Sequence, residues 1–183
     1  MTAAAAGGRL AGIPGWPRAR LAVETLALSL GIFGAGLLVH EAAHLLVIRA
    51  LGHDGSLLVR PWRLGLGDWS IYGLHAQPAT ALPPVEQLMV NFAGPSLAAL
   101  PLALLLTRVH GRALRTALAL NVAVLLFYTL IESLYAVLES GLGLEGDWLT
   151  GVWLNYGLPL GAALLVTSYQ AARPATRPGS PPR

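Results

Sequence analysis

Cysteine and lysine are both missing from this 183-residue chain, and charged residues of any kind make up only 11% of it. Without cysteine the protein has no disulfides, no thiolate metal ligands and no cysteine nucleophile. Any bound metal must therefore be held by histidine, carboxylate or water. More than half of the residues, 55%, are hydrophobic, and the mean hydropathy is +0.60. This balance is typical of an integral membrane protein.

The basic residues are all arginine, 12 of them, and the net charge is +3. We interpret these arginines as anchors at the surface of an anionic lipid bilayer, and we predict no nucleic-acid partner. In a topology with four spans, most of them lie on one side, in the N-terminal segment, the connection 108–115 and the C-terminal tail. The positive-inside rule then predicts a multi-pass protein of a bacterial-type plasma membrane, with both termini in the cytoplasm.

Four apolar stretches reach the roughly 20 residues that a bilayer core requires. They cover about 21–51, 85–107, 113–138 and 148–169. The fold class that we predict is therefore an all-α membrane protein with four transmembrane helices. We expect one transmembrane domain over 21–170, preceded by a disordered segment 1–20 and followed by a disordered tail 171–183, which is rich in proline and arginine.

The segment 57–75, between the first two spans, is rich in β-branched, aromatic and glycine residues that partly alternate. This pattern favours a short β-hairpin with its turn near 65–68. The alternative is an irregular loop on the membrane surface, where the aromatic side chains would suit the interface.

A metal-binding motif, His40-Glu41-Ala42-Ala43-His44, lies inside the first apolar stretch. Two histidines four positions apart project from one face of a helix, so both rings can bind the same metal ion. Glu41 beside them is placed to hold a water as a general base. Ionisable groups are rare within a span and usually face a cavity, so the motif predicts a functional site. The other histidines, His53, His75 and His110, fall in connections and are predicted to be solvated.

A catalytic zinc needs a third protein ligand and an open position for water. Asp147 stands at the entry to the fourth span, on the same side as the motif, and is the ligand that we predict. Its alternative role is an exposed loop carboxylate or a helix cap. Glu132 lies about as deep in the third span as His40 does in the first, and is the alternative ligand. It could instead support a ligating histidine or pair with a buried tyrosine or arginine.

The second span opens with Asn91-Phe92-Ala93-Gly94-Pro95, at the level of the histidine motif. Gly94 lets another backbone approach closely, and Pro95 removes a helix donor. The amide of Asn91 can bond a peptide carbonyl. We predict that these three residues bind the substrate; the alternative is a helix-packing contact with an early kink.

Together these elements resemble the site-2 protease family of intramembrane zinc metalloproteases. The resemblance covers roughly His40 to Trp148 and is carried by the HExxH helix, by Asn91-x-x-Gly94-Pro95 and by the late Asp147. It implies one Zn²⁺ per chain, a β-hairpin that helps present the substrate, and an aspartate that completes the metal site. The chain departs from the family's Leu-Asp-Gly pattern, since Asp147 stands between Gly146 and Trp148.

The function that we predict is hydrolysis of peptide bonds in or near membrane-spanning segments. Zinc is held by His40, His44 and Asp147, and Glu41 is the general base. The partners are a membrane-protein segment as substrate and the lipid bilayer. The competing hypothesis is a membrane metal-binding scaffold or transporter that does not hydrolyse peptides. Haem binding is disfavoured, because histidines on adjacent turns of one helix cannot be opposite axial ligands of one iron.

Overall fold

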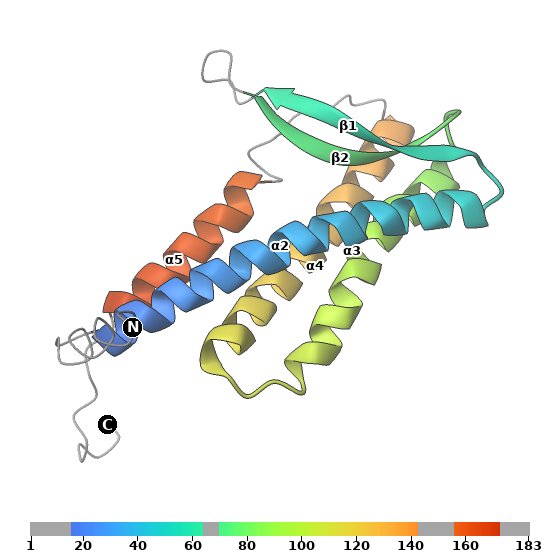
Figure 1. The fold of residues 1–183 in the computed structure, drawn as a ribbon. Coiled ribbons are helices and arrows are strands. Elements are labelled where there is room, and N and C mark those ends of the chain that lie inside the picture. Colours follow the sequence, from blue (N-terminus) through green and yellow to red (C-terminus); the bar gives the residue numbers. More distant parts are fainter. Residues whose placement is uncertain (1–15, 64–69, 143–155, 173–183) are drawn as a thin grey trace, which may run out of the picture.

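The computed structural model describes residues 16–63, 70–142 and 156–172 of the chain. Within these ranges the chain forms four helices and a hairpin between the first two of them, which confirms the predicted fold class (Figure 1). In chain order the elements are α2 (Trp16–Ala50), β1 (Gly55–Arg63), β2 (Ser70–Pro78), α3 (Pro84–Leu106), α4 (Arg112–Leu142) and α5 (Leu158–Ala172).

Three helices, α2, α3 and α4, are long and apolar enough to cross a membrane. The described part of the predicted fourth span is α5, a shorter apolar helix of 15 residues, and the start of that span lies outside the described residues. Large apolar side chains stand on the exposed faces of all four helices, for example Leu38, Leu46, Leu100, Leu130 and Leu165. A water-facing surface rarely carries so many, whereas lipid accommodates them without cost.

Helix α2 begins five residues before the predicted start of the domain, so Trp16–Arg20 are helical. Pro17 is tolerated there because the N–H groups of a first helical turn need no partner within the helix. The Arg20–Glu24 ion pair, at 2.6 Å, links the next turn. At the other end of the chain, α5 continues to Ala172, two residues into the predicted tail.

The helices form a bundle around α2 (Figure 1). Helices α3 and α4 are antiparallel neighbours and both contact α2, while α5 runs along the N-terminal half of α2. A buried cluster joins α3 to α4 and consists of Ala98, Ala99, Val124, Leu125 and Tyr128. The two alanines let the helix backbones approach closely, as small residues do in membrane helix pairs.

The hairpin lies over the C-terminal half of α2 (Figure 1). Strand β1 pairs antiparallel with β2, from Gly55 opposite Pro78 to Arg63 opposite Ser70. The structure therefore favours the predicted hairpin over a surface loop, although its turn lies outside the described residues. The N–H of Ala76 bonds to α2 and thus points away from β1. One edge of β2 consequently faces the helix that carries the histidine motif.

Candidate metal centre

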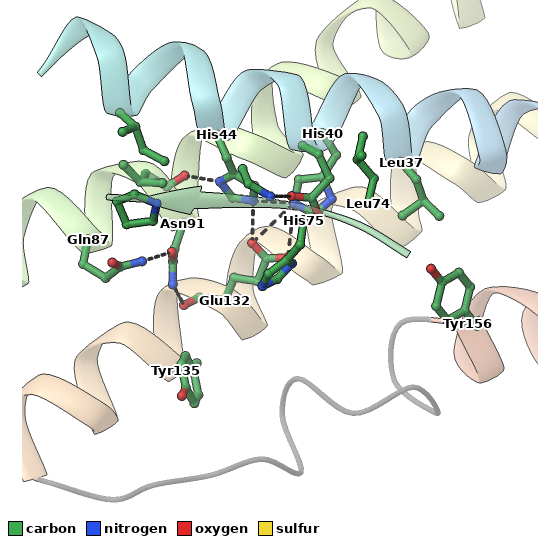
Figure 2. A pocket seen from close by; sticks show the side chains of 15 residues that line it. Leu37, His40, His44, Leu74, His75, Gln87, Asn91, Glu132, Tyr135 and Tyr156 are labelled. Atoms are coloured by element: carbon green, nitrogen blue, oxygen red, sulfur yellow. Dashed lines mark hydrogen bonds and ion pairs between the residues drawn. The ribbon is translucent and has the colours of Figure 1, made fainter. Parts of the chain in front are cut away.

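Three metal-ligand side chains meet between α2 and α4 (Figure 2). His40 and His44, one helical turn apart, are 3% and 8% exposed. Nε2 of His40 lies 3.2 Å from Oε1 of Glu132, and Nε2 of His44 lies 3.2 Å from Oε2 of the same carboxylate. The two Nε2 atoms are 2.7 Å apart. Ligand atoms around a tetrahedral ion such as zinc lie about 3.3 Å apart. Oε2 of Glu132 also lies 3.4 Å from Nε2 of His40, close to this value. One carboxylate oxygen and the two Nε2 atoms are therefore close enough together to share one metal ion, although the histidine–histidine distance is shorter.

The backbone of α3 orients one of the two imidazoles. Nδ1 of His44 lies 2.8 Å from the carbonyl oxygen of Val90, which can only accept a hydrogen bond, so Nδ1 carries the proton. In a neutral imidazole the other nitrogen then has a free lone pair, and Nε2 of His44 directs it at Glu132 and His40. Metal-binding histidines are commonly oriented in this way by a carbonyl behind the ring.

The groups that face each other in the triad are chemically suited to a cation. An imidazole lone pair and a carboxylate both accept hydrogen bonds and both bind metal ions, and neither supplies a positive charge of its own. Nδ1 of His40 is buried and has no hydrogen-bond partner within the described ranges. The donor set of His40, His44 and Glu132 therefore fits a metal ion, with Val90 holding only the second of the two rings.

The ring of His44 packs directly against Gly94 of α3. A Cβ atom added at Gly94 would lie 2.5 Å from Nδ1 of His44 and closer still to its Cε1. The sequence predicted a close approach at this glycine, with the substrate as the partner. In the structure the group that approaches it is the imidazole of His44.

We expect Gly94→Ala to displace the His44 ring and to weaken metal binding by about tenfold or more, in the range seen when a group that orients a ligand is changed. Titration calorimetry of the metal-free protein with metal measures the loss. Gly161→Ala in α5 is the matched control, because a Cβ there meets nothing within 4 Å. An unchanged affinity for the metal in Gly94→Ala would show that contact with Gly94 is not needed to position the His44 ring.

Glu41 lies beside the triad and outside it. Its Oε2 accepts a hydrogen bond from the N–H of Ala76 in β2, at 2.7 Å. Successive helical residues are rotated by about 100°, so Glu41 is turned toward the hairpin while His40 faces α4. The hairpin thus holds the carboxylate next to the metal-ligand atoms without making it a ligand.

A cavity of about 200 Å³ opens onto these groups. Its wall combines residues of α2, including Glu41, with residues of β2, α3 and α4 and with Tyr156. Figure 2 labels His75, Asn91 and Glu132 among them. The cavity is large enough for waters or a stretch of peptide backbone. An intact helix, about 10–12 Å across with its side chains, does not fit into it.

Asn91 joins the two helices on either side of the ligands. Its Nδ2 donates to the backbone carbonyl of Glu132 at 3.0 Å, and its Oδ1 accepts a hydrogen bond from Gln87 at 2.6 Å. Asn91 thus helps to set the position of α4 at Glu132, while it also lines the cavity. Pro95 lies one turn further along α3, is fully buried and is not among the residues that line the cavity, and the substrate contact predicted for it stays a prediction.

The predictions for Asp147 and for the histidines outside the motif have different outcomes. Asp147, the predicted third ligand, lies outside the described residues, and its role stays a prediction. His75, predicted to be solvated, is half-buried in the structure: it lines the cavity, and its Nδ1 is buried without a partner in the described part of the chain. The sequence carried one signal for it, namely its place in a hairpin predicted beside the first span. His53, in contrast, pairs with Glu86 at the start of α3.

The chain matches no model of a protein family, no curated protein and no solved structure. The case for its function therefore rests on the geometry of the site and on the motif residues.

Proposed function

We propose that this chain is an intramembrane zinc metalloprotease of the site-2 protease type, which hydrolyses peptide bonds in or near membrane-spanning segments. The observation that carries the proposal is the meeting of His40, His44 and Glu132 at a cavity whose wall also holds Glu41. Two histidines and a carboxylate are the protein ligands of the catalytic zinc in several hydrolases, where the fourth position stays open. The helices that carry this set are apolar enough to lie in a membrane.

The residues around the site divide the chemical work. Zinc bound by the triad would supply a coordinated water with a pKa near 7 and polarise the scissile carbonyl. Glu41 accepts the proton of the attacking water and then delivers it to the leaving nitrogen. The Ala76 N–H holds one carboxylate oxygen of Glu41, which limits the rotation of the side chain and leaves the other oxygen for the water. Val90 keeps His44 in the tautomer that binds the metal.

The substrate enters as an extended chain. A hydrogen-bonded helix shields its carbonyl groups, and the cavity of about 200 Å³ is too narrow for one. In an antiparallel pair, backbone groups of alternate residues point to the same edge, so those of Leu74 point, like the N–H of Ala76, away from β1. Both residues line the cavity. A substrate strand that pairs with this edge brings its peptide bonds alongside Glu41.

Removal of the metal tests this proposal. We expect the purified protein to cleave a synthetic membrane-spanning peptide in detergent micelles, to lose this cleavage entirely on treatment with a zinc chelator, and to regain it on addition of Zn²⁺. Mass spectrometry of the products gives the bond that is cut. Cleavage that persists after the zinc has been removed would contradict a metalloprotease. If the protein binds zinc in the triad and cleaves no membrane-spanning peptide, it would be a metal-binding scaffold or transporter.

A further inference from the structure

A second cavity, of about 360 Å³, lies beside the first one, between α2, α4 and α5. Helix α2 contributes five residues to its wall, which are Ser29, Leu30, Phe33, Gly34 and Leu37. Their spacing places them on one face of the helix. Leu37 and Tyr156 line both cavities, so the two spaces share part of their wall. An occupant of the first cavity that continues along α2 toward its N-terminus therefore enters the second.

The wall of this second cavity is mostly apolar, and its polar side chains are those of Ser29, Asn121 and Tyr156. Asn121 uses its amide on the carbonyls of Ser29 and Ala117, at 3.2 and 2.8 Å. The hydroxyl of Ser29 is buried and has no hydrogen-bond partner among the described residues. Because that oxygen has no surface open to the cavity, the surface that an occupant meets is apolar. The wall shared with the first cavity makes an apolar side chain of a peptide held there the occupant that we consider.

The distance between the two cavities sets the spacing along the peptide. Gly34 and His40 are separated by about 9 Å along the axis of α2, at about 1.5 Å per residue. An extended peptide advances about 3.3 Å per residue. A side chain about three residues from the cleaved bond therefore reaches the second cavity when the bond itself lies at the triad.

We infer that the second cavity is a specificity subsite, which takes a large apolar side chain of the substrate about three residues from the cleaved peptide bond. The inference rests on the proposed function and adds a substrate requirement to it. The substrate is then a membrane segment with a bulky residue such as phenylalanine or leucine at that position. A substitution that fills the subsite should slow cleavage of substrates with a bulky residue at that position and leave cleavage of substrates with a small one unchanged.

Gly34 allows the cavity to be filled without disturbing the fold. A Cβ at Gly34 meets nothing within 4 Å, so Gly34→Leu adds its side chain into open space at the cavity wall. Gly31→Leu is the matched control, because a Cβ there also meets nothing within 4 Å and Gly31 lines neither cavity. The probes are two membrane-spanning peptides of alanine and leucine that differ only in carrying phenylalanine or alanine three residues from the bond that the wild-type protein cuts.

We expect the wild type and Gly31→Leu to cleave the phenylalanine peptide at least tenfold faster than the alanine peptide, the scale of discrimination in an apolar pocket. In Gly34→Leu this preference should disappear, through loss of cleavage of the phenylalanine peptide, with the alanine peptide cleaved at the wild-type rate. Equal cleavage of both peptides by the wild type, or an unchanged preference in Gly34→Leu, would overturn the subsite. Slowing of both peptides to the same extent would also overturn it.

Photo-crosslinking separates this inference from the proposed hydrolysis. A peptide with benzoylphenylalanine at the test position should crosslink to α2 or α5 in the wild type and in Gly31→Leu, and not in Gly34→Leu. Where no bond is cut, benzoylphenylalanine is placed in turn at each position of the peptide, so the experiment does not require cleavage. Crosslinks to these helices from a peptide that is never cleaved would support the binding site and refute the protease. Crosslinks elsewhere would refute the subsite.

Discussion

Glu132→Ala is expected to lose its zinc. The carboxylate of Glu132 is the group that the structure brings within 3.2 Å of both imidazoles, and without it two neutral histidines would face the metal alone. Changes to groups that merely orient a ligand cost about 10–100-fold in affinity, so removal of the ligand itself should cost about 100-fold or more. Competition with a chromophoric chelator of known affinity measures the dissociation constant, and elemental analysis gives the zinc content of the purified protein.

Two further variants make this experiment decisive. Glu139→Ala is the matched control, because Glu139 lies two turns further along the same helix and is exposed to its surroundings. It should keep the full zinc content. Asp147→Ala tests the ligand predicted from the sequence. If Asp147→Ala abolishes zinc binding while Glu132→Ala lowers the affinity by no more than about 100-fold, then Glu132 supports the histidines and is not a ligand.

The competition between these two acidic residues illustrates what a sequence can and cannot specify. The spacing of His40 and His44 requires only the geometry of a single helix, so their shared face was predictable. Whether Glu132 reaches them depends on how α4 is rotated and how far it slides along α2. Tertiary contacts set both quantities, such as the bond from Asn91 to the carbonyl of Glu132 and the packing of Tyr128 in the core between α3 and α4. No periodicity in the sequence encodes such contacts.

The fold itself was largely predictable, because the length and apolar character of a stretch are enough to identify a helix that can cross a bilayer. The limits of α3 and α4 agree with the predicted stretches to within a few residues. The cavity beside the metal centre was not predictable. It lies where α5 packs against α2 beside α4, and its wall includes small residues, Gly34 and Ala163 among them.

Glu41→Gln is expected to keep its zinc and its fold and to lose peptide hydrolysis by about 10²–10⁴-fold, the usual contribution of a general base. Glutamine has the size of glutamate, and its amide oxygen can still accept the hydrogen bond from Ala76. What the amide cannot do is take a proton from the attacking water. Glu24→Gln on the same helix is the control, since Glu24 makes only an exposed ion pair with Arg20, and a pair of that kind contributes little to stability.

The kinetic constants of Glu41→Gln distinguish a base from a residue that binds substrate. Because Glu41 is held next to the ligands and is not one of them, its proton transfer occurs only in the transition state, and kcat should fall while KM stays unchanged. A rise in KM at constant kcat would instead mean that Glu41 contacts the substrate, or that its bond to Ala76 keeps the β2 edge in place for pairing. Cleavage at the wild-type rate with full zinc content would rule out Glu41 as the base, and His75, which also lines the cavity, would be the next residue to test.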